Sequence, residues 1–337
     1  MAYRGFGFLF AWMGIGVYLR KLIYSTMSTF GYQANFLGED FPVLLPEIPS
    51  GLISDVAPLT AGGIILDYPK YSVVLHKFRK LPLITAANIE GGLFKDITRK
   101  SLFSGGDHWR KDDRIAPEYQ LGAELYGAEK SDFDRGHMVK REDVQWGISD
   151  DEAADSARST FYFTNAAPQH AKVNQSIWRQ IEDYILKTES VKNGLKISVF
   201  TGPVLTDQDP EFVTLVKGEV IKLPVLFWKL VYYINEANTI SRVAFLVGQQ
   251  YLLEKAGIVL RKYAVQADRE HFMNFKDADT YQVNTELIHK LTGLHFPVAH
   301  DPYQKESPVK LVLDKVNVRR GQVYESVISN RITGLTL

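Results

Sequence analysis

The strongest constraint on the fold is the strand, loop, strand and helix order that the chain predicts between residues 133 and 187. We expect the first strand over residues 133–139 and the second over residues 160–164, a run of aromatic and β-branched side chains. A helix is expected over residues 174–187, because apolar side chains recur there at helical spacing and Asn174 stands where an N-cap is wanted. The segment therefore predicts a ββα unit.

Each part of this unit carries polar side chains suited to catalysis. The first strand contains Asp134-Arg135-Gly136-His137, Asn165 follows the second strand, and Asn174 and Glu182 lie on the helix. A neutral imidazole can take a proton from water, since its unperturbed pKa is about 6.5, and Mg²⁺ prefers oxygen ligands. Glu182 lies about 12 Å beyond Asn174 along a helix axis, so it would reach a metal on Asn174 only through a water. The pattern suits one-metal hydrolysis of a phosphodiester.

The order of these motifs resembles the DNA/RNA non-specific endonucleases of the ββα-metal class, in particular the bacterial branch of the Serratia-type and endonuclease G-like nucleases. The core of the resemblance is Asp134-Arg135-Gly136-His137, Thr164-Asn165-Ala166-Ala167-Pro168-Gln169, Asn174-Gln175, Trp178 and Glu182. It extends from about Leu66 to about Leu294 through Leu66-Asp67-Tyr68, Asn88-Ile89-Glu90-Gly91, Gln120-Leu121-Gly122, Arg141-Glu142-Asp143, Trp146-Gly147, Phe200-Thr201-Gly202-Pro203-Val204-Leu205, Leu223-Pro224 and Phe227-Trp228-Lys229.

The resemblance implies an α+β fold: a central antiparallel sheet with helices and long loops, carrying a ββα-metal (His-Me finger) nuclease site. It implies a Mg²⁺-dependent endonuclease for DNA and RNA, with Mn²⁺ as a substitute ion. His137 would be the general base, Asn174 the metal ligand and Glu182 a water-mediated metal contact, while Asn165 would help to hold the site. A homodimer and a protein inhibitor are partners that the resemblance leaves open.

One position departs from the family pattern. The family carries an arginine shortly before an aromatic residue, well ahead of the catalytic histidine, where it stabilises charge in the transition state. Here the aromatic residue is Trp109, and the four residues before it include no arginine. Arg110 follows Trp109 and Arg99 precedes it by ten residues; of the two we favour Arg110 as a catalytic residue.

Three further residues of the motif have expected roles. Arg135 could bind a substrate phosphate bidentately, and Asp134 could orient the loop or pair with a base. Structural salt bridges are an equally open reading of both. Gly136 is expected to permit a close backbone approach or a positive φ.

Composition leaves two rival functions open. Basic and acidic residues balance at 39 each, which neither supports nor excludes a nucleic-acid binder, because a local groove is sufficient. The displaced arginine motivates a nucleic-acid-binding protein that has lost catalysis, and the same site architecture could serve a phosphodiesterase of small nucleotides. The chain has no cysteine, which excludes disulfides, thiolate metal sites and a cysteine nucleophile.

We expect an N-terminal hydrophobic segment and lead-in over residues 1–62, the endonuclease domain over 63–300 and a C-terminal tail over 301–337. The apolar run at residues 5–19 is shorter than the roughly 20 residues of a membrane span and lacks a small-residue cleavage site. This run could be an export signal or a membrane anchor, or the true start could be Met27. The sequence does not choose between these alternatives, so it leaves the localisation open.

The remaining elements follow from apolar patterning and turn residues. We expect a hairpin of residues 71–76 and 83–88, and a long loop over 104–132 with a short helical piece near Gln120 and Tyr126. Later strands are expected over residues 195–201, 225–234 and 242–249, and a helix over 284–294.

Overall fold

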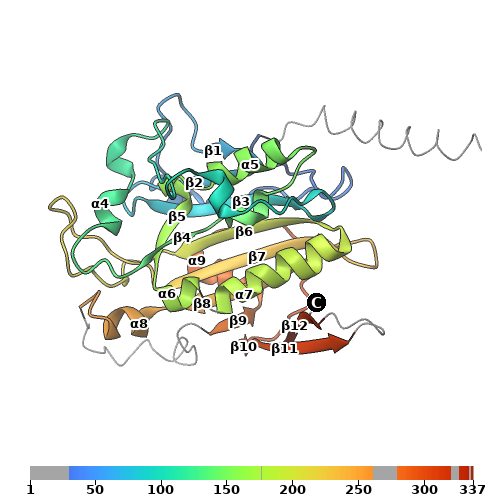
Figure 1. Cartoon of the computed structure of the whole chain (residues 1–337). Helices are drawn as coiled ribbons and strands as arrows, with labels where there is room; N and C mark the ends of the chain where they lie inside the picture. The colour runs from blue at the N-terminus through green and yellow to red at the C-terminus, as the bar shows by residue number, and fades with distance from the viewer. Residues whose placement is uncertain (1–29, 176, 261–278, 320–325, 334, 337) are drawn as a thin grey trace, which may run out of the picture.

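The computed structural model describes residues 30–175, 177–260, 279–319, 326–333 and 335–336. Its centre is an eight-stranded sheet in the order β1-β2-β3-β6-β7-β8-β9-β10, in which each neighbouring pair is antiparallel (Figure 1). The strands are β1 (Leu66–Tyr68), β2 (Tyr71–His76), β3 (Leu81–Glu90), β6 (Lys196–Val204), β7 (Leu226–Ile234), β8 (Ile240–Gly248), β9 (Thr280–Val283) and β10 (Val309–Lys310). The expected α+β fold with a central antiparallel sheet is confirmed.

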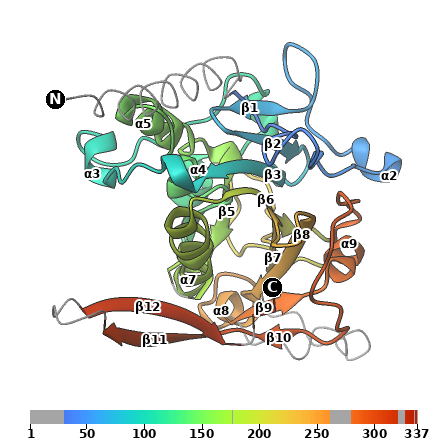
Figure 2. The same cartoon turned by 90° about the vertical axis from the view of Figure 1, so that its right-hand side faces the viewer.

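Helices cover both faces of this sheet, which explains why its central strands are buried along most of their length. On β7, Phe227 and Val231 belong to the cluster that contains Trp178 and Ile181 of α7 (Ile177–Asp183). Trp228, Leu230 and Tyr232 belong to the opposite cluster, with Ile288 of α9 (Thr285–Thr292). Figure 2 shows α7 and α9 on opposite sides of the sheet.

The strands and helices expected outside the ββα unit are found within a few residues of their predicted bounds. The hairpin is β2 and β3, the later strands are β6, β7 and β8, and the late helix is α9. The helical pieces of the long loop are α4 (Ala123–Tyr126) and a 3₁₀ turn, Pro117–Tyr119. Other short helices are α2 (Ser50–Ile53), α3 (Arg99–Leu102), α5 (Asp150–Ser159) and α8 (Gln250–Lys255).

The ββα unit is present, but its second strand lies later than predicted. β4 (Asp134–His137) pairs with β5 (Ala166–Gln169), whereas residues 160–164 follow the end of α5 and enter a 3₁₀ turn, Phe163–Asn165. The prediction of a strand over 160–164 was wrong, because the aromatic side chains there serve a packed cluster. Phe161 contacts Phe103 at 4.8 Å and Trp109 at 5.2 Å between ring centroids. Aromatic residues are enriched in strands, so a buried aromatic-rich segment that is not a strand has the same composition as one.

The helix of the unit also begins differently. It starts as α6 (Ala171–Asn174), continues as α7 and ends as a π-helix, Tyr184–Val191. Asn174 is the last residue of α6 and not an N-cap, so that prediction was wrong. The cap of α6 is His170, whose side chain accepts a hydrogen bond from the backbone N–H of Lys172.

The two ends of the chain are described only in part. The apolar run at residues 5–19 lies outside the described residues. Residues from 30 onward pack on the sheet, since Gln33 N donates to Asn88 Oδ1 at 2.7 Å. Near the C-terminus, β10 joins the sheet, and β11 (Val312–Arg319) and β12 (Ser326–Thr333) form a separate hairpin. None of the helices in the described ranges is long and apolar enough to cross a membrane.

Gly136 gives a direct test of the β4–β5 pairing. A Cβ at this position would overlap with the side-chain amide of the fully buried Gln169, so Gly136 permits a close approach, as expected. We predict that Gly136→Ala lowers the free energy of unfolding by about 1–3 kcal/mol, as overpacking usually does. Urea unfolding measures this. Gly51→Ala is the control, because a Cβ there meets nothing within 4 Å; equal effects would contradict the packing argument.

Candidate active site

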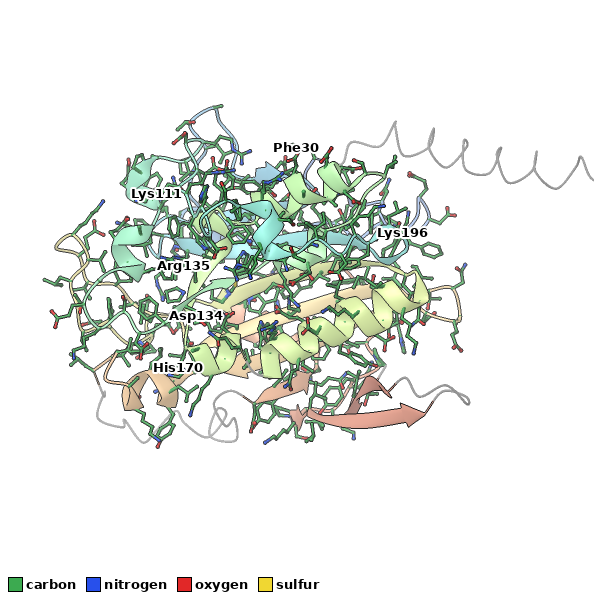
Figure 3. All side chains as sticks on the ribbon, in the orientation of Figure 1. Phe30, Lys111, Asp134, Arg135, His170 and Lys196 are labelled. Atoms are coloured by element: carbon green, nitrogen blue, oxygen red, sulfur yellow. The ribbon has the colours of Figure 1, made fainter. Side chains whose placement is uncertain are left out.

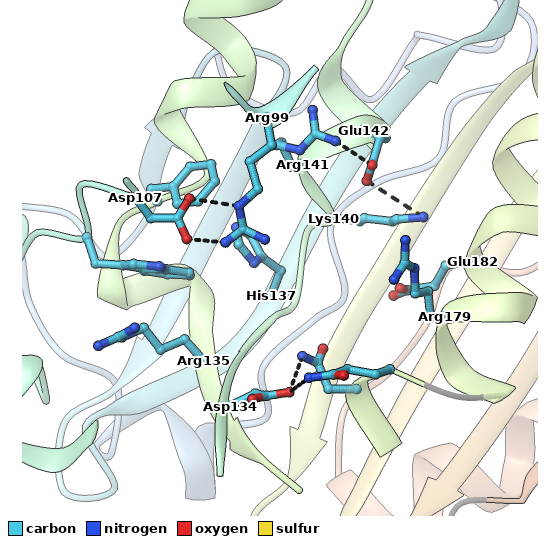
Figure 4. Close-up of a pocket in the computed structure, with 14 residues that line it drawn as sticks. Arg99, Asp107, Asp134, Arg135, His137, Lys140, Arg141, Glu142, Arg179 and Glu182 are labelled. Atoms are coloured by element: carbon cyan, nitrogen blue, oxygen red, sulfur yellow. Dashed lines mark hydrogen bonds and ion pairs between the residues drawn. The ribbon is translucent and has the colours of Figure 1, made fainter. Parts of the chain in front are cut away.

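A cavity of about 480 Å³ opens between the ββα unit and the segment from α3 to Trp109 (Figure 4). It contains most of the predicted site residues, and Figure 3 shows Asp134 and Arg135 on β4 near the start of α6. The residues that line it are Arg99, Asp107, Trp109, Asp134, Arg135, His137, Lys140, Arg141, Glu142, Phe161, Asn174, Gln175, Arg179 and Glu182. The fold therefore brings side chains from five separate parts of the chain to one place.

His137 is the last residue of β4 and forms part of the cavity wall. Its ring packs against Trp109 and Phe161, with centroid distances of 4.7 and 5.0 Å. Its Nε2 is buried and has no hydrogen-bond partner among the described residues. Burial lowers the pKa of His137 to about 3, and the nearby Arg99 guanidinium acts in the same direction. The imidazole is therefore neutral at pH 7 and able to accept a proton.

Asp134 orients the amides of Asn174 and Gln175. Its Oδ2 accepts hydrogen bonds from Asn174 Nδ2 at 2.9 Å and from Gln175 Nε2 at 2.8 Å (Figure 4). Because the nitrogen of Asn174 is engaged by Asp134, its Oδ1 is the atom left for a cation. This geometry is compatible with Asn174 as a metal ligand and with the expectation that Asp134 orients it.

The oxygen donors of the cavity fit a magnesium ion better than a transition metal. Asn174 and Glu182 both line the cavity, and Mg²⁺ is commonly held by one or two protein oxygens, with waters and phosphates completing its shell. No group of three or more histidine, aspartate or glutamate residues that could hold a metal occurs in the part of the chain that the structure describes. A dedicated cage of carboxylates and imidazoles is thus absent from that part.

Glu182 is nearly buried, and its Oε1 lies 3.1 Å from the ammonium of Lys229 on β7. Beside it, Lys140 pairs with Asp183 and lies 3.7 Å from Glu142. The carboxylates on this side of the cavity are therefore held by lysines, and neither Lys140 nor Lys229 was singled out as a site residue from the sequence. The one earlier sign was the place of Lys229 in Phe227-Trp228-Lys229, a segment of the family resemblance.

Arg99, and not Arg110, is the arginine that faces His137. Arg99 comes from α3 and donates from Nε to Asp107 Oδ1 at 2.7 Å, and this ion pair lowers the pKa of Asp107 (Figure 4). Arg110 does not line the cavity; its guanidinium lies over the ring of Tyr162, 4.2 Å from the centroid. The structure therefore favours Arg99, because α3 packs in one cluster with α5, Phe161 and Trp109, a contact that residue spacing could not reveal.

Asn165 lies behind the cavity wall and does not line it. It is fully buried; its Oδ1 accepts from Val139 N and its Nδ2 donates to Val139 O, both at 2.9 Å, and to Thr160 O at 3.1 Å. These bonds engage the whole amide. Asn165 thus holds the chain just after His137, which is a positioning role.

Three further arginines line the cavity. Arg135 is exposed, with its guanidinium 5.5 Å from the ring centroid of Tyr126. Arg179 on α7 is 59% exposed, and Arg141 donates to Glu142 and to the backbone oxygen of Ile97. Guanidinium groups are well suited to phosphate recognition, so this lining can receive a polyanion.

Two curated proteins are similar to this chain in sequence. An uncharacterized protein y4fB of Sinorhizobium fredii is 34% identical over 232 residues, which cover 65% of this chain and 32% of that protein. Human mitochondrial endonuclease G is 31% identical over 129 residues, 36% of this chain and 40% of that protein. The chain thus matches less than half the length of each curated relative.

Among solved structures, a chain of the EndoG/EndoGI complex aligns with a TM-score of 0.49 at 17% identity, over 74% of this chain and 92% of that one. The sequence model of the DNA/RNA non-specific endonuclease family matches residues 48–301. Since this match spans well over half of the 337 residues, the chain belongs to the DNA/RNA non-specific endonuclease family.

Proposed function

We propose that this protein is a metal-dependent endonuclease that hydrolyses phosphodiester bonds of DNA and RNA with little base preference. The observation that carries the proposal is the neutral, buried imidazole of His137 in a cavity that also contains Asn174, Glu182 and several arginines. A proton acceptor, oxygen donors for a cation and guanidinium groups for phosphate are the parts that such hydrolysis needs.

His137 is the proposed general base. A general base must be unprotonated at the working pH and must reach the proton it removes. Burial against Trp109 and Phe161 keeps the ring neutral, and its Nε2 has no competing hydrogen-bond partner in the described ranges. The ring is therefore able to accept a proton from a water in the cavity. Asn165 supports this role indirectly, because it fixes the backbone of Val139.

Asn174 would hold Mg²⁺ directly, with Mn²⁺ as a substitute, and Glu182 would contact it through a water. When bound, the ion would supply Lewis-acid stabilisation of negative charge on the phosphate oxygens and the leaving oxygen. Asp134 prepares this arrangement by binding the amide nitrogen of Asn174. Asp134 would therefore act on the metal indirectly, by orienting the side-chain amide of Asn174.

The arginines bind and stabilise the phosphate. Among the arginines, Arg99 has the largest electrostatic effect on the pKa of His137. We therefore assign the transition-state contact to Arg99. Arg135, Arg141 and Arg179 would contact phosphates of the strand. Contacts to the backbone position a nucleic acid without reading its sequence, which is consistent with cleavage of both DNA and RNA.

The presence of Arg99 in the cavity weakens the main rival. A binding protein without catalysis was motivated by the lack of an arginine before Trp109, and Arg99 supplies that charge from α3. The second rival, a phosphodiesterase for small nucleotides, can be distinguished from an endonuclease by its products. An endonuclease cuts supercoiled plasmid internally, whereas the phosphodiesterase would release mononucleotides from ends.

The first prediction concerns the reaction itself. Purified protein should nick supercoiled plasmid and degrade RNA with Mg²⁺, and EDTA should stop both. His137→Ala should lower the rate by about 10²–10⁴-fold, the usual contribution of a general base. His300→Ala is the control, because His300 is exposed and does not line the cavity. A wild type that binds nucleic acid but cuts none with Mg²⁺ or Mn²⁺ would favour the binding-protein alternative.

The second prediction distinguishes the two arginines. Arg99→Met should lower kcat on plasmid by about 10²–10³-fold, as the loss of one charge contact in the transition state does. Arg110→Met is the matched control and should change kcat little, because Arg110 lies over Tyr162 outside the cavity. Equal losses in both variants, or a loss in Arg110→Met alone, would return the assignment to Arg110.

The third prediction measures the neutral state of His137 without metal or substrate. The unfolded chain takes up a proton on this residue below about pH 6.5, whereas the folded protein resists it down to about pH 3. The contribution of His137 to the free energy of unfolding is therefore fully present above pH 6.5, and it is lost as the pH falls toward 3. In urea unfolding with EDTA, wild type should lose more stability between pH 7.5 and pH 5 than His137→Asn. Parallel losses would show that the ring is protonated in the folded state.

A further inference from the structure

Lys229 is a buried cation in the middle of the central sheet. It lies on β7 with its side chain only 2% exposed, on the same face as Phe227 and Val231. This face is covered by Trp178 and Ile181 of α7. Burial of an unpaired ammonium has a large unfavourable free energy. An acidic partner next to Lys229 is therefore strongly favoured.

The partner of Lys229 is Glu182, a residue of the cavity wall. The ammonium lies 3.1 Å from Glu182 Oε1, and the Trp178 ring centroid lies 5.6 Å from it. The neighbouring Lys140 pairs with Asp183 and Glu142 instead, among the described ion pairs. The contact therefore links the core of the sheet to the carboxylate that faces the cavity.

We propose that Lys229 is a positioning residue that fixes Glu182 for its part in the reaction, an inference that rests on the proposed function. Rotation of Glu182 away from Lys229 would separate the buried ammonium from the carboxylate 3.1 Å away and leave it only the more distant charge of the buried Asp143, which favours one orientation of Glu182. Oε1 is buried and lies in ion-pair contact with the ammonium, although it accepts no aligned hydrogen bond among the described residues, and Oε2 is the oxygen left for the cavity. Lys229 thus acts through Glu182 and does not contact the substrate.

The chain contains a matched pair that separates positioning from ordinary stability. Lys70 is also buried, at 1% exposure, lies 3.3 Å from Glu152 Oε1, and has its ammonium 4.3 Å from the centroid of Trp146. Neither Lys70 nor Glu152 lines the cavity. Loss of either lysine leaves a glutamate without its ammonium partner, but only Lys229 is tied to the site.

The experiment compares Lys229→Met, Lys229→Arg and Lys70→Met on supercoiled plasmid with saturating Mg²⁺. We expect Lys229→Met to lower kcat by about 10- to 100-fold, as the loss of an outer partner of a metal site does, with KM little changed. Lys229→Arg should recover part of the rate. Lys70→Met should keep the wild-type kcat, while urea unfolding reports a loss of stability in both methionine variants.

A double-mutant cycle with Glu182→Gln tests whether the effect passes through Glu182. In that background Lys229→Met should have almost no further effect on kcat, and the same cycle in urea unfolding without metal should show coupling between the two residues. Independent effects that multiply, or a Lys229→Met enzyme as active as Lys70→Met, would overturn the inference alone. A wild type that cuts no nucleic acid would overturn the proposed function, and this inference with it.

Discussion

The site depends on the antiparallel pairing of β4 with β5. This pair places His137 opposite Ala166. Because Gly136 has no side chain, the side-chain amide of the buried Gln169 can pack directly against its backbone. Asn165 extends the pairing past the end of β4, since its amide bonds to both backbone groups of Val139. His137, the proposed base, is thus anchored by the backbone contacts of β4 and of Val139, and α6 and α7 follow β5 to bring Asn174 and Glu182 to the same cavity.

The electrostatics of the cavity explain how a protein with balanced charge could receive a polyanion, such as the nucleic acid of the proposed function. Each carboxylate on its wall has a partner: Asp107 binds Arg99, Asp134 binds two amides, and Glu142 and Glu182 are held by cations. The exposed guanidinium groups of Arg135 and Arg179 remain in its lining. A low-dielectric cleft concentrates such local charge, so the net charge of the whole chain says little about the site.

Errors in the sequence-based expectations have local physical causes. Residues 160–164 carry strand-like composition because Phe161 and Phe163 are buried in an aromatic cluster around Trp109, and not because they join a ladder. Asn174 looked like an N-cap because it precedes the apolar helical positions, yet the helix had already begun under the cap of His170. Arg110 was favoured over Arg99 because it is nearer to Trp109 in sequence, whereas the fold of α3 determines which guanidinium enters the cavity.

The sequence by itself was sufficient to predict most of the elements and to suggest the chemistry of the motif. Apolar patterning placed β2, β3, β6, β7, β8 and α9, and the spacing of His137, Asn174 and Glu182 indicated a one-metal site. Only the tertiary structure decided which charges meet there. Arg99 with Asp107, and Lys229 with Glu182, are separated by 8 and by 47 positions in the chain, and their contacts arise from the packing of α3 with α5 and Trp109 and of α7 on the sheet. Such contacts depend on distances in space, which local sequence patterns do not encode.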